Sequence, residues 1–384
     1  MNILFHCWAY PPNGGGVGVY ISHMARALSR GGHRVVVATG RAPGEPAEEQ
    51  FENISVFRFY EYSEIGRTHV TDAVLRLCER YAVDLVEGAD FLGDCEPLIR
   101  REDRPPVLIK THSCNVLRVL NESQILFWWQ RIMVKAALYR NRHMTERERY
   151  SIENADMLLA SSQRILLEMK KQGLRLPEKH SVLPNPIEPN RLSHDQEAAS
   201  PTVLFVGRKD FGKGIQYLPG IVDSLSKKNP DFQMEIVGPD SYARGVGSMR
   251  AWLEKRLGDL KRYVRFHERL PNEELDKVYQ RAWVVILPSR WDTFPTVLLE
   301  AMSWGKPVVA SPHGGMPEIL EGTMCPTALP QSPEFVSWVK RFLEDGNLRK
   351  SAGASMLDKV SREYHPRSVV KSYLEFIQST KRRR

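Results

Sequence analysis

The sequence predicts an α/β chain with two doubly wound domains, each built on a parallel sheet that helices cover on both faces. Apolar runs of strand length alternate with segments of helical periodicity, and this alternation occurs twice, from residue 2 and again from residue 202. Between the two series, residues 187–201 are polar and contain proline, which is typical of a hinge. The length of 384 residues also favours about two domains.

The first series starts with an apolar run at 2–7, and a Pro-Gly loop follows at 10–18. Residues 19–29 carry apolar side chains at helical spacing. Gly31-Gly32 ends this predicted helix, because glycine adopts a positive φ at little cost. The further strands expected in this series are 34–39, 55–59, 83–87, 107–111, 157–160 and 181–184.

In the second series, strands are expected at 202–206, 233–238, 263–266, 283–287 and 307–310. We therefore expect one domain at residues 1–187 and a second at 188–365, and a helix at 367–379. Doubly wound sheets bind ligands outside the carboxyl ends of their strands. The site is therefore expected in a cleft between two facing domains.

Composition excludes several classes of protein. With 42% hydrophobic and 26% charged residues, the chain is neither disordered nor collagen-like nor a disulfide miniprotein. No apolar run exceeds about six residues, whereas a membrane span needs about 20, and residues 1–7 lack the basic leader of a signal peptide. The five cysteines are scattered without a CxxC pair, which is typical of reduced thiols in a cytoplasmic protein.

The net charge is +8, and the last four residues, 381–384, contribute four of these charges. The rest of the chain is only weakly basic, which argues against a nucleic-acid binder. The remaining positive charge suits an anionic ligand or an anionic membrane surface. No metal site is predicted, because His, Cys and Asp do not occur at the spacing of metal ligands.

A basic loop at 204–214 follows a predicted strand and opens a helix. Arg208 offers a planar fork of hydrogen-bond donors, and Lys213 offers a compact cation five residues later. Both side chains can converge on a diphosphate. The alternative is a solvated basic loop, since Lys and Arg are commonly exposed.

A second segment, at 288–302, also joins a predicted strand to a helix. Pro295 before Thr296 suits the first turn of a helix, whose free amides can bind phosphate. Asp292 and Glu300 lie eight positions apart and can face one ligand, where carboxylates accept hydrogen bonds from sugar hydroxyls. The alternative is that Asp292 caps the helix and that Glu300 is an exposed helix acid.

Three further segments lie beside predicted strand ends. Gly314-Gly315 forms a turn before a helix, in which Glu318 is interpreted as a helix-start acid. The glycine cluster at 11–18 lacks the lysine of a P-loop and the third glycine of a dinucleotide fingerprint, but it can close over a ligand. His112 follows the strand expected at 107–111. A lone histidine is usually structural, and its place at the cleft favours a functional role.

Together these segments resemble the retaining family 4 glycosyltransferases of the GT-B fold, over nearly the whole chain. The motifs that carry the resemblance are Pro11-Pro12 with Gly15-Gly16, Gly32-His33, Gly207-Arg208 with Lys213-Gly214, Asp292 with Glu300, Gly314 to Glu318, and Asn185 in Leu-Pro-Asn-Pro. The resemblance implies two Rossmann-like domains facing across a cleft, an acceptor domain first and a nucleotide-sugar donor domain second. It also implies that the segment 366–384 packs back onto the first domain.

The resemblance further implies a metal-independent, retaining hexosyltransferase without a cofactor. Such an enzyme moves a hexose from a nucleotide diphosphate sugar, with UDP-sugars favoured, to an unidentified hydroxyl acceptor in polysaccharide, glycolipid or glycoconjugate synthesis. The implied catalytic residues are Arg208 and Lys213, which stabilise the leaving diphosphate, and His112, which contacts the transferred sugar. The implied donor-binding residues are Gly15, Gly16, Asp292, Thr293, Phe294, Thr296, Val297 and Glu300. His267 and Arg269 are implied to lie near the nucleotide base.

Several positions depart from the usual residues of that family. Asp292 stands where Glu is usual, and Thr293 and Pro295 replace glycines. These departures leave the hexose and the base open. Two rival functions remain at this point: a GT-B-fold sugar-nucleotide epimerase, which needs an acid/base pair at the sugar, and a non-catalytic binding module that kept the cleft.

Residues 123–150 are expected to form a long helix with aromatic residues near its start and basic residues at helical spacing. Together with the basic tail at 381–384, this helix suggests weak peripheral contact of a cytoplasmic enzyme with the inner face of a membrane. The alternative is a helix that covers the first sheet.

Overall fold

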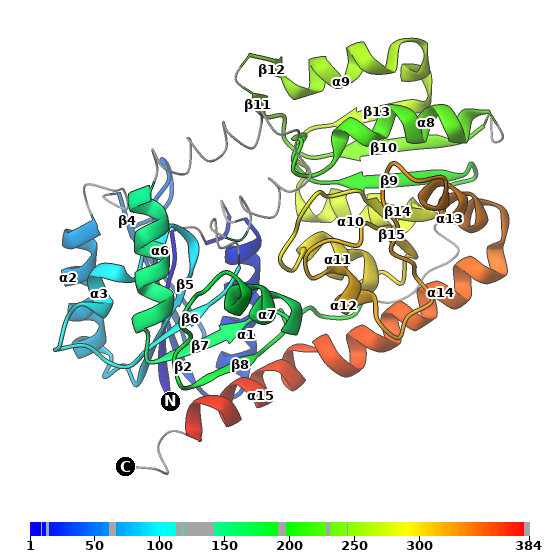
Figure 1. Ribbon diagram of the computed structural model, residues 1–384. Coiled ribbons are helices and arrows are strands. Elements are labelled where there is room, and N and C mark those ends of the chain that lie inside the picture. Colours follow the sequence, from blue (N-terminus) through cyan, green and yellow to red (C-terminus); the bar gives the residue numbers. More distant parts are fainter. Residues whose placement is uncertain are drawn as a thin grey trace. The chain divides into compact units, whose positions relative to one another are not determined.

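The computed structural model describes residues 1–8, 10–12, 15–60, 67–112, 117, 142–190, 197–227, 231–243 and 245–379. The chain forms two compact units (Figure 1). Unit 1 comprises Met1–Pro186 with Pro366–Arg384, and unit 2 comprises Ile187–His365. Each unit is an α/β fold on a mainly parallel sheet, which confirms the predicted fold class.

The sheet of unit 1 has the strand order β3-β4-β2-β1-β5-β6-β7-β8. Its strands are β1 (Asn2–His6), β2 (Arg34–Gly40), β3 (Glu48–Phe51), β4 (Ile54–Phe59), β5 (Leu85–Ala89), β6 (Val107–Lys110), β7 (Met157–Ala160) and β8 (His180–Val182). β3 pairs antiparallel with β4, and the other neighbours are parallel. The central strands are continuous buried apolar runs, because helices cover both faces of a parallel sheet.

The helices of unit 1 are α1 (Gly16–Arg30), α2 (Arg67–Arg80), α3 (Glu96–Ile99), α6 (Arg142–Asn154), α7 (Gln163–Lys171) and α15 (Pro366–Gln378), with the 3-10 turn η1 (Phe91–Gly93). The C-terminal helix α15 packs against α1 (Figure 1). It adds Val369, Tyr373 and Ile377 to the same core that buries Ile3 and Met24. For the described residues, this confirms that the C-terminal segment returns to the first domain.

Unit 2 has a five-stranded parallel sheet of order β13-β10-β9-β14-β15. Its strands are β9 (Thr202–Val206), β10 (Gln233–Val237), β13 (Val264–His267), β14 (Val284–Leu287) and β15 (Val308–Ala310), with a small hairpin of β11 (Tyr242–Ala243) and β12 (Gly247–Ser248). Its helices are α8 (Leu218–Ser226), α9 (Met249–Leu257), α10 (Asn272–Arg281), α11 (Thr296–Ser303), α12 (Met316–Leu320), α13 (Pro333–Glu344) and α14 (Gly346–Lys359), with the short turns η3 (Ile215–Tyr217), η4 (Gly258–Tyr263) and η5 (Val360–Tyr364).

The structure differs from the sequence prediction at a few elements. β5 begins at Leu85, two residues later than expected, because Asp84 precedes the strand and receives the N–H of Asn2 on its carboxylate at 2.9 Å. The edge strand β3 and the β11–β12 hairpin were not predicted, since their residues are mostly polar or exposed and lack an apolar run. Cys7, Cys78, Cys95 and Cys325 are buried free thiols, and Cys114 lies outside the described residues.

The basis of the membrane-contact hypothesis lies mostly outside the described residues. Of the helix expected at 123–150, the structure describes 142–150, which begin α6, and the basic tail at 381–384 is not described. Within the part of the chain that the structure describes, every helix is too short or too polar to cross a lipid bilayer.

In each sheet the order of strands reverses beside the first strand of the unit. In unit 1 the reversal lies between β1 and β5, and in unit 2 it lies between β9 and β14. Doubly wound sheets bind ligands outside the carboxyl ends of the strands at such a switch point. The topology therefore indicates that a ligand site lies at the loops that follow these four strands.

The contact of α14 with the turn that follows α11 depends on a glycine. Gly353 of α14 is buried against Gly305, and a Cβ at Gly353 would overlap the Gly305 carbonyl oxygen. Gly353→Ala is therefore expected to destabilise unit 2 by about 1–3 kcal/mol, because the backbone of one element must move. Urea unfolding followed by tryptophan fluorescence measures the loss.

The matched control for this prediction is Gly220→Ala in α8. A Cβ at Gly220 meets no atom within 4 Å. Because alanine has the higher helix propensity, the control should be neutral or more stable by about 0.5–1 kcal/mol. Equal stability of the Gly353→Ala protein and the wild type would contradict the overlap.

Candidate functional site

Two loops meet at the switch point of unit 2. The loop after β9 carries Lys213, and the loop after β14 carries Asp292. Their side chains form an ion pair, with 2.5 Å between Nζ and Oδ2, and both are largely buried. The N–H of Arg290 also donates to the carbonyl of Gly212 at 2.8 Å. The structure thus brings together two side chains that the sequence analysis assigned to one ligand.

Two glycines let these loops approach each other closely. Gly214 has a φ of +84°, and a Cβ there would overlap the Pro288 carbonyl. Gly314 has a φ of +66°, and a Cβ there would overlap the carbonyl of Asp292, which accepts from the N–H of Gly315 at 2.9 Å. The loops after β9, β14 and β15 therefore interlock, and this packing explains why the motifs contain glycine at these positions.

Arg208 extends from the same loop toward solvent. Its side chain is 59% exposed, and its Nη2 lies 3.1 Å from Oδ2 of Asp210. Asp210 also accepts the main-chain N–H of Lys213 at 2.8 Å through its other oxygen. Asp210 therefore links the two cations of the motif. This role of Asp210 was not predicted from sequence, although a carboxylate between two cations could have indicated it.

Helix α11 begins beside this ion pair. Pro295 is the N-cap residue, and the first helical residue is Thr296, so the proline stands one position earlier than the first-turn proline that was expected. The amides of Thr296 and Val297 lie in the first turn and have no acceptor within the helix. Such amides, together with the helix dipole, favour an anion. Thr293 and Phe294 precede the helix and have buried side chains.

Glu300 lies on α11 and makes a specific contact. The hydroxyl of Tyr279 donates to its Oε2 at 2.8 Å. Burial raises the pKa of Glu300 above its ordinary value, although the hydrogen bond from Tyr279 works in the opposite direction. The alternative interpretations from sequence are therefore wrong: Glu300 is a partly buried, hydrogen-bonded acid rather than an exposed one, and Asp292 pairs with Lys213 while Pro295 is the N-cap.

The residues predicted to lie near a base follow β13. His267 is the last residue of that strand, and its Nε2 lies 3.1 Å from Oε2 of Glu235. Glu235 also accepts from Nε of Arg281 at 2.7 Å. Arg269, two residues further, is exposed. The structure places both residues at the carboxyl end of the sheet, two strands from β9.

In unit 1, His112 lies just after β6 and close to the switch point. The main-chain N–H of His112 donates to Oδ1 of Asp90, which follows β5, at 2.9 Å. Its ring meets the ring of Tyr20 edge to face at a centroid distance of 4.7 Å. Burial and the nearby charge of Lys110 lower the pKa of His112 well below its ordinary value, so the imidazole is neutral at neutral pH.

A buried polar cluster lies next to His112 and contacts it through the ring of Tyr20. Tyr20 donates its hydroxyl to Oε1 of Glu87 at 2.9 Å, and Nζ of Lys110 donates to the carbonyl of Leu183 at 2.6 Å. Burial raises the pKa of Glu87 and lowers that of Lys110, because both charged forms are removed from water. This cluster was not predicted from sequence, since its members lie in apolar runs and meet only in the folded unit.

The glycine loop of unit 1 begins α1. Gly15 is the N-cap residue with a φ of −91°, and Gly16 is the first helical residue. A Cβ at Gly15 would meet no atom within 4 Å. The fold of unit 1 therefore does not demand glycine at position 15, and a bound molecule that approaches the backbone would supply a reason for it.

A cavity of about 620 Å³ lies elsewhere in unit 2, between α8 and α13. Its wall includes Gln216, Tyr217, Pro333 and Lys340. Among the described residues, none of those predicted for the site lines this cavity. The candidate site is therefore the open ends of the strands and not this cavity.

Two family descriptions match the chain in succession. "Glycosyltransferase Family 4" matches residues 14–191, and "Glycosyl transferases group 1" matches residues 187–355. The chain is 26% identical to the uncharacterized glycosyltransferase MJ1607 of Methanocaldococcus jannaschii, over 91% of each chain.

Solved structures share the fold. A sucrose-phosphate synthase of Thermosynechococcus elongatus matches with a TM-score of 0.82 at 20% identity, over 99% of this chain and 98% of its own. HepE of Anabaena, in complex with UDP-glucose, matches with a TM-score of 0.72 at 18% identity, over 99% of this chain and 100% of its own. Both likenesses extend over both units.

The raised pKa of Glu300 has a consequence for stability. A carboxyl whose pKa is raised by folding destabilises the folded state as the pH rises from the ordinary value through the raised value. Glu300→Gln removes this cost and keeps an acceptor for Tyr279. The variant is therefore expected to be more stable than the wild type, with a larger gain at pH 8 than at pH 5, as measured by urea unfolding at both pH values.

Glu344→Gln, at an exposed position at the end of α13, is the control and should change little at either pH. A loss of stability on Glu300→Gln, or a gain that does not depend on pH, would show that burial of the charged Glu300 carboxylate does not lower the stability of the folded state.

Proposed function

The chain belongs to the family 4 glycosyltransferases of the GT-B fold and transfers a sugar from a nucleotide sugar, and from this premise we propose that it is a retaining hexosyltransferase that uses a UDP-hexose and a hydroxyl acceptor. The observation that carries the proposal is the Lys213–Asp292 pair at the switch point of unit 2, beside the first turn of α11. This place offers a cation and helix amides to a diphosphate.

The diphosphate gains negative charge as its bond to the anomeric carbon breaks. Lys213 and Arg208 neutralise this charge, and the amides of Thr296 and Val297 donate to phosphate oxygens. Asp210 holds the two cations near each other, since it contacts the side chain of Arg208 and the main chain of Lys213. Positioned charges of this kind stabilise the transition state most where charge develops.

Carboxylates of unit 2 recognise the sugar hydroxyls of the donor. Glu300 accepts from the ribose, and Asp292 accepts from the hexose. Thr293 and Phe294 have buried side chains, so they contribute main-chain groups to the hexose. The base lies beside His267 and Arg269 in this proposal.

Unit 1 contributes His112 and the loop of Gly15 and Gly16. A neutral imidazole has one donor and one acceptor, which suits a hexose hydroxyl. The glycine loop allows the main chain to approach the donor. In this proposal, residues 1–187 form the acceptor domain and residues 188–365 form the donor domain.

UDP is the favoured nucleotide because HepE, which has the same fold, is in complex with UDP-glucose. The acceptor hydroxyl belongs to a growing polysaccharide, a glycolipid or another glycoconjugate. The linkage follows from the acceptor.

Retention is proposed to occur by attack on the face from which the diphosphate leaves. Asp292 and Glu300 are assigned to sugar hydroxyls in this proposal, so neither serves as the nucleophile of a double displacement. The acceptor oxygen bonds to the anomeric carbon, the bond from that carbon to the phosphate oxygen breaks, and the acceptor proton passes to the departing phosphate oxygen.

A panel of UDP-, GDP- and ADP-sugars tests the donor. The UDP-sugars are expected to raise the melting temperature most, since a ligand at 100 times its Kd stabilises a protein by about 2.7 kcal/mol. Product from the best donor and an acceptor panel should keep the anomeric configuration of the donor by NMR.

An inverted product would contradict the proposed stereochemistry. Incubation with donor alone is the control: release of an epimerised donor would favour the sugar-nucleotide epimerase. Binding without transfer or donor hydrolysis, across the whole acceptor panel, would favour a non-catalytic module.

Lys213→Met tests the diphosphate site. Loss of the ammonium should lower kcat/KM by about 100-fold, which corresponds to about 2.7 kcal/mol of transition-state stabilisation. Lys227→Met is the matched control, because Lys227 is exposed at the end of α8 and its ammonium pairs with Asp223, one turn earlier. A rate for Lys213→Met within twofold of the wild type, in a protein with normal far-UV circular dichroism, would remove Lys213 from the mechanism.

A further inference from the structure

One lysine of the basic loop is fully buried. Lys209 has no exposed side-chain surface, although its neighbour Arg208 is 59% exposed. Its Nζ donates to the main-chain carbonyls of Gly238 and His267, with 2.9 Å to the oxygen of His267. The same Nζ lies 3.7 Å from Oε1 of Glu268. A buried ammonium is costly unless hydrogen bonds and a counter-charge compensate it, and here both are present.

The contacts of Lys209 join three strand ends. Lys209 follows β9, Gly238 follows β10, and His267 ends β13. The main-chain N–H of Lys209 also donates to the carbonyl of Pro239 at 3.0 Å, and the N–H of Gly238 donates to the carbonyl of His267 at 3.2 Å. The ammonium therefore sits where the main chains of β9, β10 and β13 leave the sheet.

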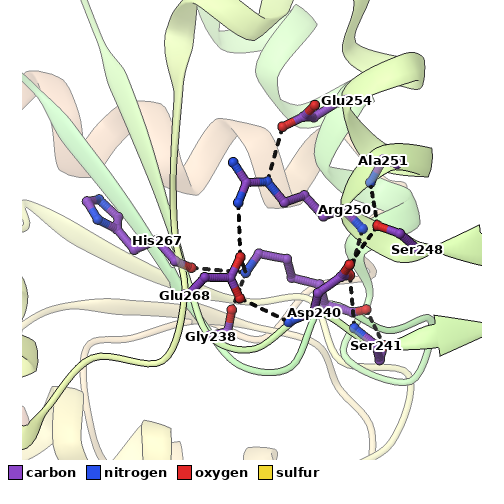
Figure 2. Close-up of polar contacts among 10 residues, drawn as sticks. Gly238, Asp240, Ser241, Ser248, Arg250, Ala251, Glu254, His267 and Glu268 are labelled. Atoms are coloured by element: carbon purple, nitrogen blue, oxygen red, sulfur yellow. Dashed lines mark hydrogen bonds and ion pairs between the residues drawn. The ribbon is translucent and has the colours of Figure 1, made fainter.

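The counter-charge of Lys209 is itself held in place. Figure 2 shows Glu268 between Arg250 and Asp240: Nη1 of Arg250 donates to Oε1 at 3.0 Å, and the N–H of Asp240 donates to Oε2 at 3.4 Å. Asp240 in turn accepts from the hydroxyl of Ser248 at 2.6 Å, in the β11–β12 hairpin. A single network thus fixes the loop after β10, the hairpin and the turn after β13.

We propose that Lys209 is a positioning residue for the nucleotide base, acting through the His267–Glu268 peptide. The proposal rests on the proposed function, in which the base lies beside His267 and Arg269. The ammonium fixes the carbonyl of His267 and therefore the direction in which Glu268 and Arg269 leave the strand. Discrimination between bases needs donors and acceptors held in fixed places, so loosening this peptide weakens base recognition and spares the diphosphate site.

Lys209→Met tests the proposal, because methionine keeps most of the volume and removes the donors and the charge. Isothermal titration with UDP, GDP and inorganic pyrophosphate separates the base from the diphosphate. The variant should bind the preferred nucleotide at least tenfold more weakly, discriminate less between UDP and GDP, and bind pyrophosphate as the wild type does. At saturating donor, kcat should stay within about threefold, so that the loss appears in KM.

The control is again Lys227→Met, which should leave all three affinities unchanged. Unchanged discrimination in Lys209→Met would overturn the proposal, and so would an equal loss of UDP and pyrophosphate binding, since that would mean a general collapse of the loop.

Glu268→Gln keeps the proposal testable if Lys209→Met does not fold. Glu268 is half exposed, so its replacement is tolerated more easily. Removing the counter-charge should weaken nucleotide binding more than pyrophosphate binding, whereas Glu273→Gln, at an exposed position of α10, should change neither. Unaltered nucleotide affinity in Glu268→Gln would overturn the proposal.

Ligand binding by the wild type separates a failure of the proposed function from a failure of the role of Lys209. A wild-type protein that binds neither nucleotide nor pyrophosphate contradicts the proposed function together with the role of Lys209. A wild type that prefers one nucleotide, and a variant that keeps the same preference, contradict the role of Lys209 alone.

Discussion

The ion pair between Lys213 and Asp292 is the interaction on which the candidate site depends. It joins the loops after β9 and β14 at the point where the strand order of unit 2 reverses. The pair can form only because Gly214 and Gly314 let three loops pack backbone against backbone. The same interlock sets where α11 starts, and thus where its first-turn amides and Glu300 lie. One ion pair and two glycines therefore position the polar groups of unit 2.

Polar groups whose burial costs stability lie near the switch points of both units. Glu300 is partly buried against one phenol, Lys209 is buried with two carbonyls and a carboxylate, and Glu87 is buried with Tyr20 and Lys110 nearby. Burial shifts the pKa of each of these ionisable groups against its charged form. Protein cores avoid such groups unless they are needed, so their concentration beside the two switch points supports a functional reason for them.

Much of the fold could be predicted from sequence, because its determinants are local. The buried strands are short apolar runs, and a glycine turn or proline marks the start of α11 and α12. The motif residues Lys213 and Asp292 were predicted to serve one site, and they meet. Tyr279, Tyr20 and Lys209 were not found, since each acquires its role from a partner at least 20 residues away in the chain. Such pairings leave no periodic pattern. The polar edge strand β3 was missed for a related reason, because pairing with β4 alone makes it a strand.

The ion pair also connects the two kinds of recognition that the proposed function requires. The side chain of Asp292 is one methylene shorter than that of a glutamate, and it already forms an ion pair with Lys213. A diphosphate at α11 offers Lys213 a stronger counter-charge than one carboxylate does. In the proposed function, the ammonium turns to the diphosphate, and the oxygens of Asp292 then become available to hexose hydroxyls. In that proposal, hexose recognition follows diphosphate binding, because Asp292 pairs with Lys213 until the diphosphate is bound. The proposed order is compatible with an aspartate at position 292 and with Pro295 instead of an amide donor, because the main-chain amides of Thr296 and Val297 remain for the diphosphate and the Asp292 carboxylate is released for the hexose.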